Sequence, residues 1–204
     1  DLAAESVGGT GIVVSLRLER VEIESCDAGV RATAMALEWE GTDASFELFC
    51  VDSLFVENGI GILAGVDPTG ATQGGRVTAR STSFEAHLQA ATLTGWIPLD
   101  LEECVIRGGG DGIRLVESSG SAVACTIVDN AIGVASGDPQ YTSFDLLDSI
   151  VFDNGDDLLG TGLVVRHCDI GDGDFAGTNG NVSADPLFWA AEFGDYRLAA
   201  GSPC

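Results

Sequence analysis

The sequence predicts an all-β chain wound into a β-solenoid, and three observations lead to that prediction. A short strand-like unit recurs from Ser53 onward at intervals of 28, 23, 21, 24 and 19 residues. The chain has 28 glycines and only 5 prolines, which suits many tight turns between short strands. No long stretch has the period of an amphipathic helix. Parallel strands that recur without helices between them indicate stacked coils rather than βαβ units.

The repeat unit has three columns with a physical meaning. A small residue comes first: Ser53, Ser81, Cys104, Cys125, Ser149 and Cys168. Two positions on, the residue is mostly apolar, and a period of two places both columns on the inner face of a strand. Five positions on come Asn58, Ala86, Gly109, Asn130, Asn154 and Gly173. Stacked Asn side chains in this column would hydrogen-bond between turns, and Asn and Gly tolerate left-handed backbone.

Three regions follow from the repeats. Residues 1–20 are expected to form an extra strand or an incomplete first turn. Residues 21–183 hold the coil, which begins with a weaker copy of the unit at Val21. Residues 184–204 form a tail that is expected to cap the coil. Because no initiator Met precedes Asp1, the chain reads as a mature form or an excised piece.

The repeat unit resembles that of right-handed parallel β-helix proteins, the pectate-lyase-like superfold. The tail strengthens the resemblance, because its segments ADPLF from Ala184, DYRL from Asp195 and GSPC from Gly201 are similar to the closing segment of secreted bacterial β-helix repeat proteins. The resemblance implies a right-handed parallel β-helix of about seven turns with a C-terminal capping segment. It also implies a location outside the cell or on the surface of a bacterium, and it says little about function.

The charge of the chain excludes several classes of partner. There are 32 acidic residues against 9 basic ones, all nine of them arginine, so the net charge is −23. Nucleic acid and anionic membrane surfaces are therefore not expected as partners. No apolar stretch is long enough to span a membrane, so no membrane insertion is expected. Lysine chemistry is excluded because there is no lysine.

Proteins that share the resembled fold often cleave acidic polysaccharides, so the resemblance also implies a possible enzymatic activity of that class. Hydrolysis needs paired carboxylates, for which Asp156 and Asp157 are candidates, although an Asp pair after Asn-Gly is also ordinary turn chemistry. Lyases of this fold use Lys or Arg as base, which leaves Arg107 and Arg114. The Gly-His-Gly and Arg-Ile-Lys segments of the polygalacturonase-like members do not occur.

His167 is the best isolated candidate for a general base. It stands one residue before Cys168, and Asp148 holds the same column on the preceding turn. Turns stack about 4.8 Å apart, so Asp148 would orient the imidazole. The rest of the column is largely charged, which favours a solvated outer row as the alternative. The other histidine, His87, falls in a turn and is expected to be exposed.

An acidic column raises the possibility of calcium. Asp129, Asp153 and Asp172 belong to three units, and Asp169 and Asp174 stand beside the last of them. Stacked carboxylates repel unless they are splayed in water or hold a cation, and calcium prefers oxygen ligands. A calcium site and a solvated acidic edge both remain open at this point.

The cysteines and the outer strand face complete the sequence-based expectations. Cys104 and Cys125 are expected to stack inside as thiols. Cys26 and Cys50 have the spacing to pair across one turn, and Cys204 is expected to dock in the terminal cap.

The outward positions of the main strand form an apolar face, represented by Leu54, Val56, Val128, Ile150 and Phe152. The long inserts 64–78 and 89–100 would cover this face, or it would dock another subunit.

These observations favour a non-catalytic exported module that serves as a stalk, an adhesin or a glycan-binding domain. Its expected partners are extracellular glycans or surface proteins. A polysaccharide lyase or glycoside hydrolase is the first alternative, and a self-associating structural subunit is the second.

Overall fold

The computed structural model describes residues 2–7, 11–26, 28–34, 43–66, 74–87, 89–94, 97–137 and 140–204. These residues form an all-β structure with long parallel sheets, and no α-helix occurs among them. One short 3-10 turn, Ala191–Phe193, lies near the C-terminus. Within the same described ranges, no helix is long and apolar enough to cross a membrane.

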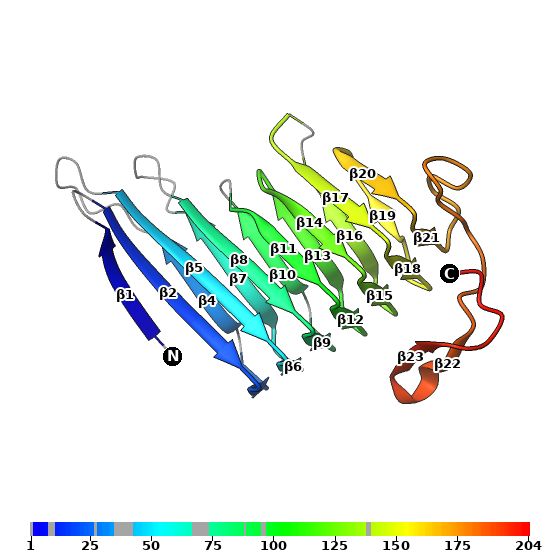
Figure 1. Ribbon diagram of the computed structural model, residues 1–204, viewed down its shortest axis with the longest axis horizontal. Helices are drawn as coiled ribbons and strands as arrows, with labels where there is room; N and C mark the ends of the chain where they lie inside the picture. Colours follow the sequence, from blue (N-terminus) through cyan, green and yellow to red (C-terminus); the bar gives the residue numbers. More distant parts are fainter. Residues whose placement is uncertain are drawn as a thin grey trace.

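The strands are arranged in three large sheets and one small hairpin (Figure 1). The eight-stranded sheet contains β1 (Leu2–Val7), β2 (Gly11–Glu19), β5 (Asp43–Val51), β8 (Gly74–Arg80), β11 (Leu99–Glu102), β14 (Ser119–Val123), β17 (Ser143–Leu147) and β20 (Leu163–Arg166). The six-stranded sheet contains β4 (Ala28–Ala34), β7 (Ile60–Val66), β10 (Gln89–Thr94), β13 (Asp111–Val116), β16 (Ile132–Ser136) and β19 (Leu158–Leu159). The seven-stranded sheet contains the shortest strands: β3 (Glu22–Glu24), β6 (Leu54–Val56), β9 (Ser83–Glu85), β12 (Val105–Arg107), β15 (Thr126–Val128), β18 (Ile150–Phe152) and β21 (Asp169–Ile170). The hairpin pairs β22 (Phe188–Ala190) with β23 (Asp195–Leu198).

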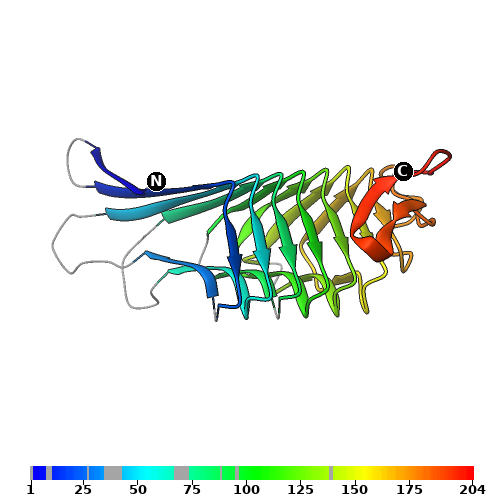
Figure 2. The same ribbon diagram turned by 90° about the horizontal axis from the view of Figure 1, so that it is seen from below.

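The topology is that of a coil. From β2 to β21, successive strands visit the three large sheets in turn, and each strand pairs in parallel with the strand three places further along the chain. Among the described strands, antiparallel pairing joins β1 to β2 and, in the hairpin, β22 to β23. This arrangement is consistent with a β-solenoid, and Figure 2 shows the turns stacked side by side. Equivalent residues are 32 positions apart in the first turn but 21 apart between Gly109 and Asn130, so the coil widens toward its N-terminal end.

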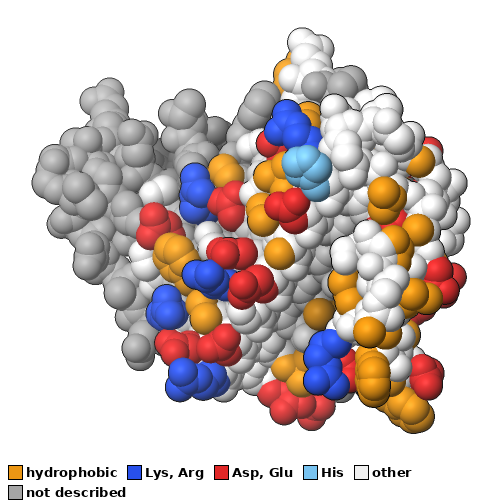
Figure 3. Space-filling model, turned by 45° about the vertical axis from the view of Figure 1, so that its right-hand side comes forward, with side chains coloured by type: hydrophobic (Ala, Val, Ile, Leu, Met, Phe, Trp, Pro, Cys, Tyr) orange, Lys and Arg blue, Asp and Glu red, His pale blue; other side chains and the backbone are white. Residues whose placement is uncertain are grey.

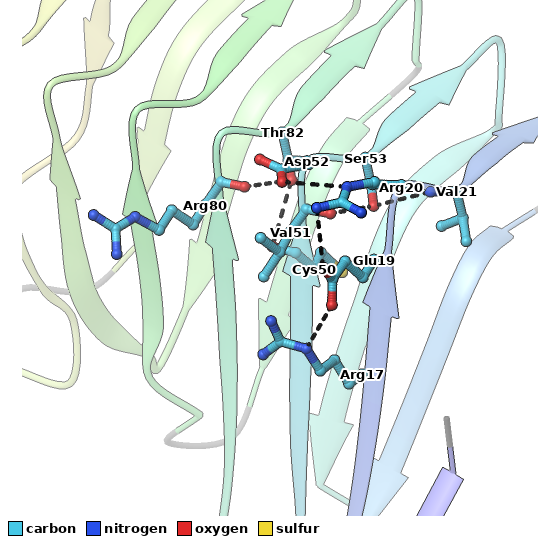
Figure 4. Close-up of polar contacts among 10 residues, drawn as sticks. All are labelled: Arg17, Glu19, Arg20, Val21, Cys50, Val51, Asp52, Ser53, Arg80 and Thr82. Atoms are coloured by element: carbon cyan, nitrogen blue, oxygen red, sulfur yellow. Dashed lines mark hydrogen bonds and ion pairs between the residues drawn. The ribbon is translucent and has the colours of Figure 1, made fainter.

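Each turn bends sharply on both sides of the seven-stranded sheet through residues in left-handed conformation. Before the short strand these corner residues are Arg20, Asp52, Ser81, Glu103, Ala124, Asp148 and His167, with φ between 47° and 54°. After it they are Ser25, Glu57, Ala86, Gly108, Asp129 and Asp153. Such a conformation costs a non-glycine residue about 1–2 kcal/mol. The corners persist because their N–H groups bond to the next turn, as Asp52 does to the Arg80 carbonyl at 3.1 Å (Figure 4).

The core lies between the three sheets and is built from inward-pointing residues at every second position. The seven-stranded sheet contributes the fully buried side chains of Phe55, Phe84, Ile106, Ile127, Val151 and Ile170. The rings of Phe55 and Phe84 stack with centroids 5.0 Å apart. Where a small residue opens each unit, its hydroxyl or thiol bonds to the carbonyl two residues earlier, as Ser149 does to Leu147 at 2.8 Å. These polar side chains are therefore satisfied locally inside the coil.

The predicted Asn column exists as a hydrogen-bonded ladder. Each member accepts a hydrogen bond from a backbone N–H of the preceding turn: Cys26 to Asn58, Gly109 to Asn130 and Asn130 to Asn154, at 2.9–3.1 Å. The Asn130 amide also donates to the Val128 carbonyl at 2.9 Å and to Asn154 Oδ1 at 3.0 Å. The column thus supplies partners for N–H groups at corners where strand pairing is interrupted.

The register of one repeat differs from the sequence prediction by one residue. Ser83 pairs with Leu54 and with Val105, so the third unit opens at Thr82 rather than at Ser81. Two adjacent hydroxyl residues make both registers look alike, but only the observed one points Phe84 into the core. With this shift, the ladder position of the unit belongs to His87 and not to Ala86. The prediction that His87 is exposed is wrong, because only 3% of its surface is accessible.

The cysteines are all free thiols. Cys104 and Cys125 lie buried in the predicted inner column, and Cys50 and Cys168 are also buried. Cys26 is exposed whereas Cys50 points into the core, so the pairing that their spacing allows is not formed. Burial raises the pKa of the Cys50 thiol to about 12, with a smaller contribution from Cys104. Core thiols of this kind are poor nucleophiles.

We expect a thiol reagent at neutral pH to modify Cys26 rapidly and the core cysteines only on unfolding. Cys204 should react slowly, because burial and the Asp169 carboxylate raise the pKa of its thiol to about 12. Mass spectrometry of the labelled peptides gives the order of reaction. Fewer than six reactive thiols in denaturant without reductant would contradict the free-thiol assignment.

Replacing Asn130 by Ala should destabilise the protein by about 2–4 kcal/mol, because the Gly109 N–H and the carbonyls that Asn130 serves lose their partners in the interior. Urea unfolding measures the loss. Ser119→Ala, on an exposed position of β14, is the control and should change the free energy of unfolding by less than about 0.5 kcal/mol. Equal effects of the two substitutions would show that the ladder does not stabilise the coil.

Candidate functional site

The C-terminal strap, residues 184–204, returns along the outer face of the seven-stranded sheet. Its β22–β23 hairpin is anchored by Tyr196, whose hydroxyl donates to Asp129 Oδ2 at 3.1 Å. Partial burial and the Asp129 carboxylate raise the pKa of Tyr196, so the phenol stays protonated and donates. Next to it, Gly194 packs on the guanidinium of Arg107, which is itself paired with Glu85. Gly194 has φ of +76°, and a Cβ there would lie 3.1 Å from Arg107 Nη2.

A buried carboxylate fastens both ends of the strap. Asp169 lies on the last short strand, and its Oδ1 accepts a hydrogen bond from the Ala184 N–H at 3.0 Å. Its Oδ2 accepts from the Cys204 thiol, also at 3.0 Å. Cys204 therefore contacts the last short strand of the coil, and one side chain of the coil holds the first and last residues of the strap.

The strap covers part of the predicted apolar outer face. Val128 is 2% exposed, and the other members of the face, Leu54, Val56, Ile150 and Phe152, are partly exposed. The inserts 64–78 and 89–100 do not provide this cover in the described part of the chain. Their described residues extend β7, β8, β10 and β11 instead, and residues 67–73 and 95–96 lie outside the described ranges.

Two hollows flank the hairpin. The inner hollow, of about 290 Å³, lies between the strap and the coil and is lined by Val128, Asp129, Phe152, Asp153, Phe188 and Tyr196 among others. The outer hollow, of about 320 Å³, is lined by Trp189, Arg197 and Leu198. Phe188 meets the Tyr196 ring edge-on at 5.1 Å and closes the inner side. Trp189 is 69% exposed and Phe193 84%, and Figure 3 shows hydrophobic side chains gathered over this segment.

Arg197 and the arginines on the face of the eight-stranded sheet form ion pairs with neighbouring carboxylates. Arg197 donates to both carboxylate oxygens of Asp195, and these hydrogen bonds lower the pKa of Asp195 to about 2. On the coil, Arg80 pairs with Glu102 at 2.9 Å and Arg17 with Glu19 at 3.2 Å. Figure 3 shows such basic and acidic side chains interspersed, and Figure 4 shows the group around Arg17 and Arg20.

The structure brings together one of the predicted catalytic pairs. His167 Nδ1 lies 3.6 Å from Asp148 Oδ1, with the two residues at corners of adjacent turns. Their side chains are 69% and 67% exposed, beside a hollow of about 320 Å³ that Cys204 also lines. The spacing agrees with a stacked outer row, and the catalytic role of the pair stays a prediction.

The other catalytic candidates are engaged elsewhere. Asp157 is buried, and its Oδ1 accepts hydrogen bonds from the Asn154 N–H and side-chain amide, so it ends the ladder. Burial raises its pKa, against the hydrogen bonds from Asn154 and Asp172. Asp156 is partly exposed beside it. Arg114 pairs with Asp111 at 2.6 Å.

The calcium candidates likewise have separate partners. Asp129 bonds to Tyr196, Asp169 holds the strap, and Asp172 Oδ2 accepts from the Asp157 N–H at 3.1 Å. Asp172 Oδ1 also accepts from the N–H of Asp174, and Asp153 lines the inner hollow. Among the described residues, no three His, Cys, Asp or Glu side chains are placed to hold a metal ion.

Comparison of the chain with models of known protein families, with curated proteins and with solved structures found no match. The fold and the strap surface therefore carry the functional argument by themselves. Sequence reasoning missed this surface, although the aromatic residues of the tail and the apolar outer columns were its two visible signals.

We expect Tyr196→Phe to loosen the strap, because it removes the hydrogen bond to Asp129, which is worth about 0.5–1.5 kcal/mol. Cleavage by chymotrypsin within the strap should accelerate by roughly two- to tenfold. Arg197→Gln is the control, because the ion pair that it removes joins Arg197 to Asp195 in the same hairpin and does not connect the strap to the coil. Unchanged cleavage of Tyr196→Phe would show that this contact does not hold the strap.

Proposed function

We propose that this chain is a non-catalytic glycan-binding module of an exported bacterial protein. In this proposal it is a right-handed parallel β-helix of about seven turns, similar to the pectate-lyase-like repeat proteins, whose C-terminal segment caps the coil and carries the binding surface. The all-β architecture with its long parallel sheets supports the proposed fold. The exported location rests on the resemblance of the repeat and the tail.

The observation that carries the proposal is the exposed Trp189 at the outer hollow. Burying an indole ring is strongly favourable, so a large exposed aromatic is usually found where a partner covers it. Sugar rings present flat C–H faces that pack on aromatic rings, and Arg197 offers hydrogen-bond donors at the edge of the same hollow. Phe193, one turn further along the hairpin, extends the aromatic surface.

The contacts of the predicted catalytic residues favour a binding role over an enzymatic one. A lyase would need a basic side chain free to accept a proton, but Arg107 and Arg114 are both paired with carboxylates. A hydrolase would need two carboxylates facing one substrate, but Asp157 is turned into the ladder. These assignments leave His167 and Asp148 as the remaining predicted pair, exposed beside the hollow that Cys204 also lines.

The charge around the strap favours neutral glycans over polyuronates. Asp185, Glu192 and Asp195 lie on the strap itself, and the charge of Arg197 is compensated by Asp195. A polyanion would approach a molecule of net charge −23 against repulsion. A neutral chain that stacks on Trp189 meets no such barrier.

Binding to insoluble neutral polysaccharides, namely cellulose and chitin, tests the proposal. The protein should be retained by at least one of them, and Trp189→Ala should weaken retention by about tenfold or more, the equivalent of ~1.4 kcal/mol. Phe175→Ala, which removes an exposed aromatic outside the strap, should bind normally. Soluble polygalacturonate should neither compete nor be cleaved.

Three outcomes would contradict this assignment. Retention that does not depend on Trp189 would exclude the strap as the binding surface. Release of unsaturated products from polygalacturonate would favour the lyase. A concentration-dependent molar mass in light scattering that Trp189→Ala abolishes would favour the self-associating subunit.

A further inference from the structure

His87 occupies a position in the ladder that Asn fills in other turns. The Asn58 N–H lies 3.1 Å from His87 Nδ1, in the same relation as the Gly109 N–H to Asn130 Oδ1 and the Asn130 N–H to Asn154 Oδ1. The Asn members of the column, Asn58, Asn130 and Asn154, all accept from the preceding turn. The same role assigns Nδ1 of His87 as an acceptor, which requires a neutral imidazole with its proton on Nε2.

The surroundings of the ring are unsuited to a positive charge. His87 is 97% buried, and the Phe84 ring lies at 6.3 Å in an edge arrangement. Its Nε2 has no hydrogen-bond partner among the described residues, so the N–H there is unsatisfied in the neutral ring and in the protonated ring alike. Burial lowers the pKa of His87, and contacts with the backbone of Asn58 and Phe55 and the charge of Glu85 only partly oppose this effect.

The carboxylates near His87 do not compensate for a charge on it. On the neighbouring strands and corners, the charged groups of described side chains are Glu57, Glu85, Arg107, Asp111 and Arg114. Arg107 pairs with Glu85, and Arg114 pairs with Asp111. Glu57 is exposed at a corner. The imidazolium would therefore be buried without a dedicated counter-ion.

Protonation would also reverse the direction of one rung. A protonated Nδ1 can only donate, and its available acceptor is the Asn58 carbonyl, also at 3.1 Å. The Asn58 N–H would then lose its acceptor inside the coil, and the cost of one unsatisfied buried donor would add to that of the buried charge. The Asn members of the ladder have no such protonation step near neutral pH.

We propose that His87 makes this rung of the coil an acid-sensitive joint, at which protonation breaks the link between the turn of Asn58 and the turn of His87. The fold is then held most firmly at neutral pH and loosens in acid. The loosening originates between the turn of Asn58 and the turn of His87, within the N-terminal half of the coil.

The sign of the pH dependence follows from linkage. The unfolded chain binds a proton at His87 near pH 6.5, whereas the folded chain binds it only at lower pH. Between these two values the unfolded state holds more protons, so stability falls as the pH is lowered through 6.5. A single site of this kind multiplies the unfolding equilibrium constant by up to tenfold for each pH unit.

Urea unfolding at pH 7.5, 6.5 and 5.5 tests the proposal on the wild-type protein, His87→Asn and His167→Asn. His87→Asn keeps an acceptor in the ladder but removes the titration, and its smaller side chain changes stability equally at every pH. We expect the unfolding constant of the wild type and of His167→Asn to rise between pH 6.5 and 5.5 by several-fold more than that of His87→Asn. The carboxylates common to all three proteins cancel in this comparison. Equal pH dependence of the wild type and His87→Asn would overturn the proposal.

A second measurement keeps the proposal testable if His87→Asn does not fold. NMR of the wild-type protein should show that the His87 imidazole remains neutral to a pH below 6.5. The exchange rate of the Asn58 amide, corrected for intrinsic exchange, should rise as His87 titrates. Titration of His87 at its ordinary pKa of 6.5, with the Asn58 amide still protected, would refute the joint.

Discussion

The fold depends on one constraint: backbone hydrogen bonds between turns must continue through two sharp corners per turn. Strand pairing satisfies the straight segments, but the residues that follow the left-handed corners, such as Cys26, Gly109 and Asn130, have N–H groups that need another acceptor. The side-chain ladder of Asn58, Asn130, Asn154 and Asp157 supplies it. The ladder runs beside the seven-stranded sheet, whose strands are three residues long except for the two-residue β21, while the opposite side of the coil widens toward the N-terminus.

The acidic residues are dispersed among the corners, the sheet face and the tail. The arginines of the eight-stranded sheet face are used in exposed ion pairs that contribute little stability individually, and the remaining carboxylates stand mostly at corners and in the tail. Two of them became structural acceptors: Asp129 binds Tyr196 and Asp169 fastens both ends of the strap. Two acidic side chains therefore stabilise the docking of the strap.

The coil was predictable from sequence because its rules are local, whereas the strap was not. A period of two, small first residues and an Asn column report the inner face directly, so the parallel all-β arrangement follows from them. The register failed only where Ser81 and Thr82 offer two equivalent hydroxyl residues, and this slip hid the burial of His87. The hydrogen bond from Tyr196 to Asp129 joins residues 67 positions apart, and no periodic pattern in the tail predicts such a contact.

Two adjacent aromatic residues of β22, Phe188 and Trp189, line different hollows. Phe188 faces Tyr196 and the inner hollow, so it serves the docking of the strap on the coil. Trp189, the next residue, stands where the pairing of β22 with β23 is irregular. It lines the outer hollow and remains 69% exposed. Neither the ladder nor the docking of the strap uses this indole, and its exposure is unfavourable in the isolated protein, so a role in binding is the economical explanation for its position.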